Sequence, residues 1–293
     1  MLLGDGDGFV ACACGHRHWG LHGAAGLLLT DPDRGVLLQR RAWWVHHGRT
    51  WALPGGAIRS TETAPEAAIR EANEEAAVPE DAVHLTSTSI ADHGTWSYTT
   101  VLGCTRRRVE EKAVSSESAG LRWVAPEDVE RYPLHRDFAM SWPDLRAQIG
   151  RRLVLVVDAA NVVGSRPDGW WRDRAGATRR LADQLAVLGR AGLPSGHRGL
   201  PAGEHWAWWP RIVLVVEGKA REVEPQGGVE VIAAERDGDA AIVEVAGEAL
   251  RHRQDDHVVV VTADRELRAR VAGEGAGHLG PSALLGMLEE QAR

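Results

Sequence analysis

The sequence predicts an α/β protein with two domains, one built on a mixed sheet and one on a parallel sheet. The chain has 293 residues, which is enough for two hydrophobic cores, because single domains usually hold roughly 100–200 residues. The style of the apolar runs also changes near residues 148–152. Short or alternating runs come before this point, and continuous β-branched runs come after it. We therefore expect one domain over residues 1–148 and another over residues 152–293.

The first half of the chain has the pattern of strands around a helix. Apolar or alternating runs typical of strands occupy residues 24–29, 36–40, 86–90, 95–103 and 121–124. A helix is expected from Thr63 to about Val78, because Thr63 and Glu66 form a capping box and Pro65 lies in the first turn. A second helix around residues 142–149 is expected to close this domain. The layout predicts α+β packing on a mixed sheet.

The second half has a different pattern. Continuous β-branched or apolar runs, separated by helical or polar stretches, occupy residues 153–157, 212–216, 229–233 and 258–261. Such strands are usually buried on both faces of a parallel sheet. Residues 191–210 are rich in Gly, Pro and Trp, and we expect a long loop there.

Composition limits the class of protein. Acids outnumber bases by 41 to 34, a formal net charge of −7, so no chain-wide field recruits nucleic acid. The three cysteines cannot form a disulfide framework, which fits a reducing compartment. We find no signal-peptide pattern and no window of about 18 apolar residues. We expect a cytoplasmic protein that does not bind a membrane.

An acidic motif spans the first predicted helix and the loop before it. Its members are Gly56, Glu62 after five intervening residues, and, after seven more, Arg70, Glu71, Glu74 and Glu75. At 100° per residue, the last three glutamates share one arc of the helix. Their mutual repulsion is relieved by a cation, and oxygen ligands favour Mg²⁺ (or Mn²⁺). A solvated acidic helix face is the alternative for the glutamates alone.

The full pattern resembles the signature of the Nudix hydrolase family. The resemblance implies an α/β/α sandwich with a mixed sheet. It also implies that Glu74 and Glu75 bind the metal, that Glu71 is a further ligand or the base, and that the Gly56 carbonyl completes the shell, with Arg70 and Glu62 as orienting residues. A bound water would then attack phosphorus in a nucleoside triphosphate or another nucleoside diphosphate derivative. The sequence departs from the family at Ala77, where the family has glycine.

Other residues of the first half are candidates for the same site. Glu117 resembles the late glutamate that many Nudix enzymes bring to the metal, and its alternative is a surface acid. Gly55 and Gly56 form a tight loop where backbone can approach a phosphate. Trp51, with Trp43 and Trp44, would stack a base or would simply pack beside the loop.

Acids also stand at the ends of the strands predicted in the second half. Asp158, Glu217 and Asp264 follow three of these strands, and Asp239 opens a helical stretch. Ligands of open parallel sheets bind at that edge, which predicts a Mg²⁺ or Mn²⁺ cradle. The pieces VVDAAN, GDAAIVE and VVTADRELRARV resemble the PIN-like and NYN ribonuclease superfamily. The resemblance implies that these four acids bind metal, that Asn161 and Thr262 position a phosphate, and that RNA is the partner. A generic α/β domain with acidic strand ends is the alternative.

A third group, Cys12, Cys14, His16 and His18, has residue types that bind zinc. In an extended strand these positions span about 20 Å, too far for ligands that lie ~2.0–2.3 Å from a tetrahedral ion. The spacing therefore argues against a zinc site, unless the chain turns at Gly15.

The sequence as a whole predicts a Nudix pyrophosphohydrolase fused to a PIN-like ribonuclease domain. A nucleotide-sensing regulator without turnover is one alternative, and intact Glu71, Glu74 and Glu75 argue against it. In a second alternative the chain is a house-cleaning pyrophosphatase whose C-terminal half only scaffolds it or forms a homodimer.

Overall fold

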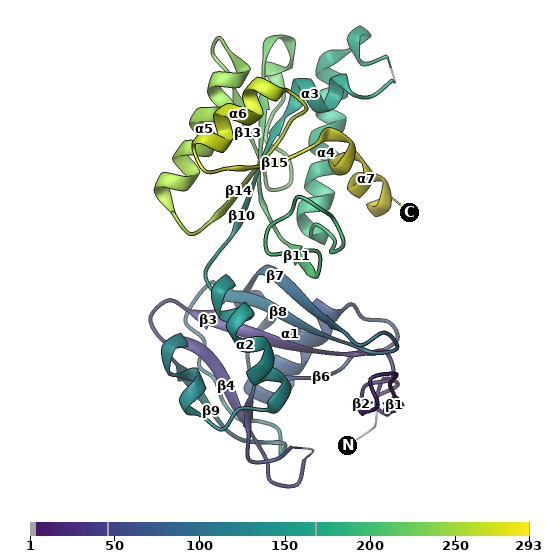
Figure 1. Ribbon diagram of the computed structural model, residues 1–293, viewed down its shortest axis with the longest axis vertical. Helices are drawn as coiled ribbons and strands as arrows, with labels where there is room; N and C mark the ends of the chain where they lie inside the picture. Colours follow the sequence, from purple (N-terminus) through teal and green to yellow (C-terminus); the bar gives the residue numbers. More distant parts are fainter. Residues whose placement is uncertain (1–3, 46, 168, 293) are drawn as a thin grey trace. The chain divides into compact units, whose positions relative to one another are not determined.

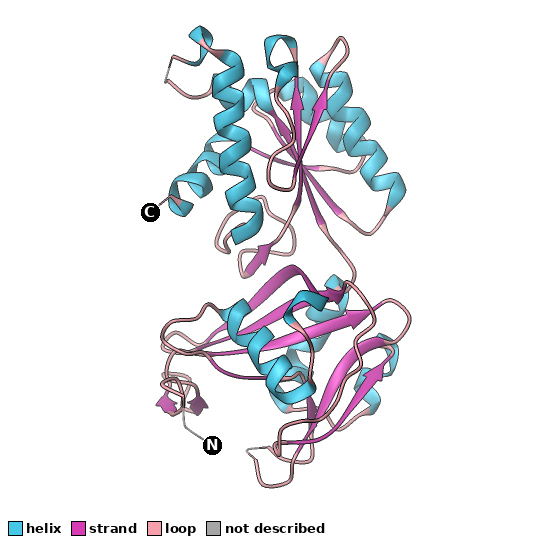
Figure 2. Cartoon of the chain, turned by 180° about the vertical axis from the view of Figure 1, so that it is seen from behind, coloured by secondary structure: helices cyan, strands magenta, loops and turns pink. Residues whose placement is uncertain are grey.

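The computed structural model describes residues 4–45, 47–167 and 169–292 (Figure 1). The chain divides into two compact units, Met1–Gly150 and Arg151–Arg293. Both units combine helices with a sheet, as the secondary-structure colours of Figure 2 show. The α/β class expected from the sequence is confirmed.

The first unit contains nine strands and two α-helices in its described residues. In chain order the elements are β1 (Phe9–Ala11), β2 (Arg17–Trp19), β3 (Ala24–Asp31), β4 (Gly35–Arg41), β5 (Trp51–Ala52), β6 (Gly55–Ala57), α1 (Ala64–Ala76), η1 (Glu80–Ala82), β7 (Val83–Asp92), β8 (Ser97–Thr105), β9 (Ser118–Val124), η2 (Pro126–Arg131) and α2 (Arg136–Gln148). All five strands expected from alternation are present. The short strands β1, β2, β5 and β6 were not expected, because two or three residues carry too little periodicity.

The sheet of the first unit is mixed. Strands β7, β8, β3, β4 and β5 follow one another in that order, with β6 beside β3 and β9 beside β4. Strands β3 and β8 are parallel, whereas β7 and β8, β3 and β6, and β4 and β9 are antiparallel. The pairing of β6 with β3 places Gly56 opposite Ala25. This register fixes the glycine loop on the middle of the sheet.

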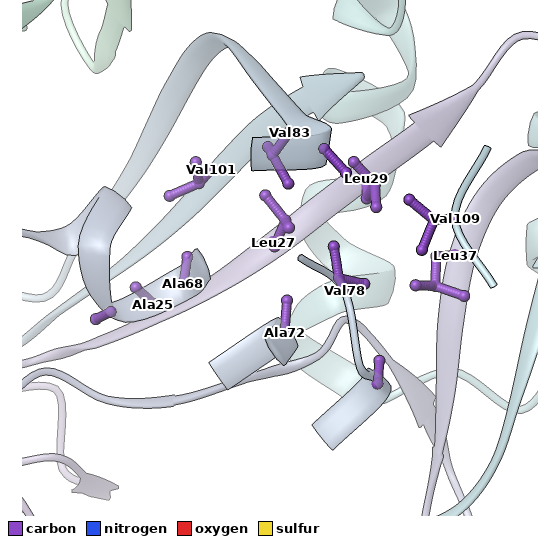
Figure 3. Packing of buried hydrophobic residues seen from close by; sticks show 13 residues of the cluster. Ala25, Leu27, Leu29, Leu37, Ala68, Ala72, Val78, Val83, Val101 and Val109 are labelled. Atoms are coloured by element: carbon purple, nitrogen blue, oxygen red, sulfur yellow. The ribbon is translucent and has the colours of Figure 1, made fainter. Parts of the chain in front are cut away.

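Helix α1 covers one face of this sheet and α2 the other (Figures 1 and 2). The α1 face is a core of small and branched side chains, in which Ala68 and Ala72 of the helix pack near Leu27 and Leu29 of β3 (Figure 3). Leu28 points to the opposite face by strand alternation and is also fully buried. Alanines on the buried side let α1 lie close to the sheet, and its carboxylates are thereby held beside the glycine loop.

The second unit is built on a parallel sheet. Its elements are β10 (Leu153–Asp158), α3 (Ala159–Gly164), η3 (Trp170–Arg172), α4 (Arg174–Ala191), β11 (Trp206–Trp208), β12 (Arg211–Val216), η4 (Gly218–Glu222), β13 (Val229–Ala233), α5 (Gly238–His252), β14 (His257–Val261), α6 (Arg265–Gly273), β15 (Gly277–Leu279) and α7 (Pro281–Gln291). The sheet order is β13-β12-β10-β14-β15, with every pair parallel. The parallel sheet expected from the β-branched runs is confirmed.

Alternation along these strands builds a core on each face of the parallel sheet. Val154 and Val156 of β10 belong to the cluster that also contains Ile242 and Ala246 of α5. Leu155 between them is equally buried and therefore points to the other face. Residues 191–210, expected to be a loop, contain the three-residue strand β11.

Across the described residues, no helix has the length and apolar character needed to cross a membrane.

Candidate functional site

Helix α1 begins as the sequence predicts. Thr63 is the N-cap, its side chain accepts a hydrogen bond from the Glu66 N–H, and the Glu66 carboxylate accepts one from the Thr63 N–H at 2.7 Å. This reciprocal pair satisfies two backbone donors that the first helical turn leaves open. The cap fixes where the helix starts, and so fixes which face Glu71, Glu74 and Glu75 occupy about two to three turns later.

Arg70 holds the acidic face together. Its guanidinium donates to both carboxylate oxygens of Glu62, at 2.9 Å from Nε and 3.1 Å from Nη2. The same group donates to Glu71 at 2.7 Å and to the Ala57 carbonyl at 3.0 Å. Burial works against the charged guanidinium, but the hydrogen bonds to Glu62 and Glu71 outweigh it and raise the pKa of Arg70. A planar fork with several donors is needed for this geometry.

Glu75 is the buried member of the acidic face. Only 6% of its surface is exposed, and its carboxylate accepts a hydrogen bond from the Gly55 N–H at 3.0 Å. Burial, reinforced by the negative charge of Glu71, raises the pKa of Glu75 to about 7, although Gln39 and the Gly55 N–H oppose the shift. The positive charge of the nearby Arg41 also opposes the increase in the Glu75 pKa. Glu75 is thus a carboxyl that titrates near neutrality in the absence of a cation.

Glu71 and Glu74 differ in how firmly they are held. Burial raises the pKa of Glu71, against the effect of its hydrogen bond from Arg70. A Cβ on Gly56 would lie 2.6 Å from the Glu71 carboxylate, so any side chain at position 56 would displace it. Glu74 is half exposed and has only long contacts of 3.4–3.5 Å, to Arg70 and Arg59. Its side chain is therefore free to reorient toward a ligand.

Tyr98, Gln39 and Arg41 belong to the same surroundings, and sequence reasoning missed them. Burial raises the pKa of the Tyr98 hydroxyl. Arg41 lowers this pKa to a smaller extent, and the negative charges of Glu75 and Glu71 add to the increase. A Cβ on Gly26 would lie 2.2 Å from the Tyr98 hydroxyl oxygen. Gln39 is buried, and among the described residues its Oε1 has no hydrogen-bond partner. All three lie on strands, and no local pattern in the sequence connects them with the acidic motif.

The other residues proposed for this site from the sequence lie around its edge. The Glu117 carbonyl accepts a hydrogen bond from Ala42 N–H at 2.8 Å, which places Glu117 beside the end of β4, next to Arg41. Trp51 packs edge-on against Tyr132, with ring centroids 5.2 Å apart, so packing accounts for it. Trp43 and Trp44 are 70% and 56% exposed, and they remain the freer surfaces for stacking.

Ala77 ends helix α1 in the left-handed conformation. Its φ is 56° and its ψ is 31°, and its N–H bonds back to Ala72 and Asn73. Most helices place glycine at such a position, because a Cβ is strained there. The helix therefore ends with the geometry that glycine usually provides, and alanine adopts this geometry at a cost in free energy.

The donor set fits a hard divalent cation. Glu71 and Glu75 of one helix lie against the glycine backbone. The Gln39 Oε1 atom, which has no hydrogen-bond partner among the described residues, lies in the same buried region. Oxygen-only donors of this kind suit Mg²⁺ or Mn²⁺ and do not suit a soft ion. Within the described residues, however, Glu71, Glu74 and Glu75 do not form a group whose oxygens all lie within 4.8 Å of one another. Side-chain reorientation, above all of Glu74, is needed to close the shell.

In the second unit, the parallel register brings the predicted acids to one edge of the sheet. Asp158 ends β10 opposite Val215 of β12, and Val157 is opposite Val261 of β14. The residues that follow β12 and β14, Glu217 and Asp264, therefore lie at the same edge. Burial raises the pKa of Asp158, with Asp239 and Glu217 adding to the shift, and burial together with Asp264 raises the pKa of Asp239.

Several of these polar groups also have structural partners. Asp158 and Asp264 are the N-caps of α3 and α6, and accept from the Asn161 and Leu267 N–H groups. The Thr262 hydroxyl donates to Asp158 at 3.0 Å, and the Asn161 side chain accepts from Ala263 N–H at 2.9 Å. Capping alone therefore explains two of the four acids. Glu217 and Asp239 have no such role.

The structure corrects the expectation for the N-terminal cysteines and histidines. Cys12 to His18 do not form an extended strand, because the chain reverses between β1 and β2 and Gly15 adopts a φ of 85°. The side chains of Cys12, Cys14 and His18 therefore meet, and the argument from a 20 Å span fails. His16 is not part of this group.

Comparison with known proteins places the first unit in a family. The NUDIX domain model matches residues 20–142. "Putative 8-oxo-dGTP diphosphatase 3" of Mycobacterium tuberculosis is 44% identical over 156 residues, which cover 50% of this chain and 71% of that protein. A "Nucleoside triphosphate pyrophosphatase/Nudix hydrolase fusion protein" of Bifidobacterium longum is 40% identical over 152 residues, 49% of this chain but only 32% of that protein.

Among solved structures, the Nudix hydrolase RenU of M. smegmatis is 44% identical, covers 48% of this chain and 93% of its own, and has a TM-score of 0.44. The second unit lies outside the residues that the family model matches. The acidic helix and its glycine loop lie within the residues that the NUDIX domain model matches, and the M. tuberculosis relative is similar over about the same half of the chain. This chain is an enzyme that belongs to the Nudix hydrolase family.

Proposed function

We propose that the first unit hydrolyses a diphosphate linkage of a nucleoside triphosphate and that it requires Mg²⁺. The observation that carries this proposal is the convergence of Glu71 and Glu75 on the Gly55–Gly56 loop. Glu74 lies on the same helix, and Arg70 contacts both Glu71 and Glu74. The substrate class rests on two relatives, whose names specify an 8-oxo-dGTP diphosphatase and a nucleoside triphosphate pyrophosphatase. Other nucleoside diphosphate derivatives remain the alternative substrates to test.

The residues of the site have separate roles in this proposal. Glu74 and Glu75 hold the ion with the Gly56 carbonyl, and Glu71 is a further ligand or the base. When bound, the ion polarises a phosphate oxygen and lowers the pKa of a water that attacks phosphorus. Arg70 and Glu62 keep Glu71 oriented, and Glu117 approaches from the loop before β9. The exposed indoles of Trp43 and Trp44 are better placed to stack a base than Trp51, which Tyr132 already covers.

A turnover assay separates this function from nucleotide sensing. The purified chain is incubated with Mg²⁺ and a panel of nucleoside triphosphates including 8-oxo-dGTP, dinucleoside polyphosphates, nucleotide sugars and 5′-triphosphate RNA. Glu74→Gln removes one charge from the acidic face, and Glu80→Gln removes the same charge from an exposed residue just beyond the helix. We expect loss of turnover by about 100-fold or more in the first variant only. Tight nucleotide binding without product release from the unaltered protein would establish a sensor instead.

For the second unit we propose a metal-dependent ribonuclease site at the edge of the parallel sheet. The specific observation in its favour is the pair Glu217 and Asp239, which lie beside Asp158 without any capping role. A Cβ on Gly238 would lie 2.6 Å from the Glu217 carboxylate, so Glu217 reaches back to the start of α5. Asn161 and Thr262 are the proposed phosphate-positioning residues. Trp171, 58% exposed beside Trp170 and Arg174, offers a stacking surface for a single strand.

The test uses single-stranded RNA with Mg²⁺ or Mn²⁺ and a charge-matched pair of variants. Asp239→Asn removes charge at the proposed site, whereas Asp255→Asn removes it from an exposed residue just before β14, at the opposite end of that strand. We expect cleavage by the unaltered chain and by Asp255→Asn, and none by Asp239→Asn. Equal RNA cleavage by both variants, or no cleavage by the unaltered chain, would leave the second unit as a scaffold.

A further inference from the structure

A cluster of thiol and imidazole groups lies apart from both acidic sites, on the hairpin of β1 and β2. The ligand atoms of Cys12, Cys14 and His18 all lie within 4.8 Å of one another, and in the described part of the chain no other trio of His, Cys, Asp or Glu residues does so. The Cys14 Sγ and His18 Nε2 atoms are 3.1 Å apart. Cys12 is buried, His18 is half buried and Cys14 is exposed. The cluster is thus anchored in the fold and open on one side.

The turn of the hairpin explains why these side chains meet. The Cys12 N–H donates to the His16 carbonyl at 2.9 Å, and the Gly15 N–H donates to the Cys12 carbonyl at 3.0 Å. Gly15 supplies the left-handed backbone that this reversal needs. The register then places His18 of β2 opposite Val10 of β1. Cys12 and Cys14 lie on the turn, so both thiols face the imidazole of the returning strand.

The geometry points to a zinc site: we propose that Cys12, Cys14 and His18 bind one Zn²⁺ ion. Ligand atoms of tetrahedral zinc lie ~2.3 Å (sulfur) and ~2.0–2.1 Å (nitrogen) from the metal, so they are separated from one another by about 3.3–3.8 Å. The observed separations, 3.1 Å for one pair and under 4.8 Å for all, need only small side-chain adjustments to reach those values. Thiolate and imidazole select zinc over Mg²⁺, which prefers oxygen. Zn²⁺ is therefore expected at the cysteine and histidine site, and Mg²⁺ at the glutamate site.

His93, in the turn between β7 and β8, supplies the fourth ligand once its ring turns toward the three others, since its nitrogens do not lie within 4.8 Å of all three ligand atoms. The ring centroids of His93 and His18 are 4.8 Å apart, whereas those of His16 and His18 are 6.5 Å apart. In the metal-free chain the Cys12 thiol donates to the His93 carbonyl at 3.3 Å, which places the two residues side by side. Cys12 releases this proton when it binds Zn²⁺ as a thiolate. A metal shared by the hairpin and this turn would link two segments about 80 residues apart in the sequence, as structural zinc sites do.

The site would stabilise the N-terminal segment that contacts Ser60, in the connection between β6 and α1. Trp96 of the same turn stacks on His18, with centroids 4.2 Å apart, and donates to the Trp19 and Gly20 carbonyls. The Gly20 N–H donates a hydrogen bond to the Gly8 carbonyl, and the Leu21 N–H donates one to the Gly6 carbonyl. Just before them, Asp5 accepts hydrogen bonds from the backbone and side chain of Ser60, next to Arg59. Zinc would thus stiffen a chain of contacts that ends beside Glu74, the partner of Arg59.

The experiment measures Zn²⁺ binding to the full chain in a non-thiol reductant with excess Mg²⁺, which occupies the oxygen site. Metal content is measured after dialysis, and Co²⁺ replaces Zn²⁺ to report ligand type, since tetrahedral thiolate coordination gives intense visible and near-ultraviolet bands. We expect one equivalent of Zn²⁺ and a thiolate spectrum. Cys14→Ser and His18→Gln should each weaken binding by about 100-fold or more, and His93→Gln by about 10-fold. Cys104→Ser and His16→Gln, which alter the same residue types outside the cluster, should bind as the unaltered chain does.

Hydrogen exchange keeps the test independent of variant folding. In the unaltered chain, Zn²⁺ should slow amide exchange over residues 8–20 and 93–96 and leave the second unit unchanged. The assignment is overturned if the unaltered chain retains no zinc, if its Co²⁺ spectrum lacks thiolate bands, or if Cys14→Ser binds as tightly as Cys104→Ser. Unchanged affinity in His93→Gln would overturn the fourth ligand. Because catalysis is not a readout, failure of the diphosphatase assay and failure of this one are distinguishable.

Discussion

The Glu75 carboxylate accepts a hydrogen bond from the backbone N–H of Gly55 at a distance of 3.0 Å. This contact joins the acidic helix to the glycine loop, as does the hydrogen bond from Arg70 to the Ala57 carbonyl at 3.0 Å. A Cβ on Gly55 would lie 2.5 Å from the Ala25 carbonyl oxygen, so the loop can approach β3 and Glu75 only as glycine. The buried Glu75 carboxylate and the glycine loop therefore depend on each other. We expect the charge on Glu75 to affect the stability of the contact between them.

Without divalent metal, the first unit should lose stability as the pH rises toward neutrality. The folded-state pKa of Glu75, about 7, lies above its ordinary value of 4.5. A raised pKa means that the folded state favours the protonated carboxyl, so its stabilising effect is complete below pH 4.5 and is lost as the pH passes through 7. The shift corresponds to about 3 kcal/mol at pH 8. In EDTA, Glu75→Gln should therefore be more stable than the unaltered chain at pH 8 and similar to it at pH 4.5.

Hydrogen exchange of peptides from α1, followed from pH 5 to 8 after correction for intrinsic rates, measures this stability within the first unit. Saturating Mg²⁺ should remove the difference at pH 8, because the ion restores a partner to the ionised carboxylate, and binding should release protons below pH 7. Glu80→Gln is the charge-matched control and should follow the unaltered chain. Stability of α1 that does not change between pH 5 and 8 in EDTA would show that Glu75 is already solvated.

Arg70→Lys should damage the site although it preserves charge. An ammonium group cannot donate at once to both Glu62 oxygens, to Glu71 and to the Ala57 carbonyl, as the guanidinium does. We expect kcat/KM to fall by about 100-fold and the first unit to lose about 2 kcal/mol, because two largely buried carboxylates lose hydrogen bonds. Arg131→Lys is the control, since its pair with Asp128 is exposed. Equal activity of both variants in steady-state assays would contradict an orienting role.

Ala77→Gly should stabilise the first unit. The residue has a φ of 56° at the end of α1, and left-handed backbone costs alanine roughly 1 kcal/mol relative to glycine. The flexible unfolded chain offsets part of this gain, so we expect an increase of about 0.5–1 kcal/mol. Ala68→Gly, in the middle of the same helix, should instead destabilise by about 1 kcal/mol or more. Denaturation followed by exchange in α1 measures both, and destabilisation by Ala77→Gly would refute the strain.

The elements that the sequence predicted are those in which one local signal is strong. The capping box at Thr63 and Glu66 located the start of α1 to the residue, and alternation or β-branching located nine strands, because burial of a whole face imposes a period. The strands that were missed, such as β6 and β15, have three residues each. Their pairing is set by partners distant in the chain, as Gly56 is by Ala25, and a three-residue window does not record that.

The candidate site shows the same limit. The motif located Glu71, Glu74, Glu75 and Arg70, because residues on one helix share a face by their spacing alone. Tyr98 and Gln39 reach the same site from β8 and β4, and nothing near them in the sequence indicates this. The argument against a cluster of Cys12, Cys14 and His18 failed for the opposite reason. It assumed an extended strand, whereas the chain reverses at Gly15. Contacts made through sheet register or a single turn therefore need the three-dimensional structure.

In the second unit, Asp158→Asn should separate a metal site from a cap. The asparagine side chain keeps the oxygen that accepts from the Asn161 N–H, so α3 should keep its cap. Burial, Asp239 and Glu217 raise the pKa of Asp158, so ionisation costs stability as the pH rises above the ordinary 3.8, and removal of the charge should stabilise the unit at pH 8 in EDTA. If the four acids bind Mn²⁺, the ion should slow exchange in β10 and α5 of the unaltered chain and leave the variant unaffected. An equal response of both proteins to Mn²⁺ would show that Asp158 is only a cap, since a ligand cannot lose its charge without losing affinity for the ion.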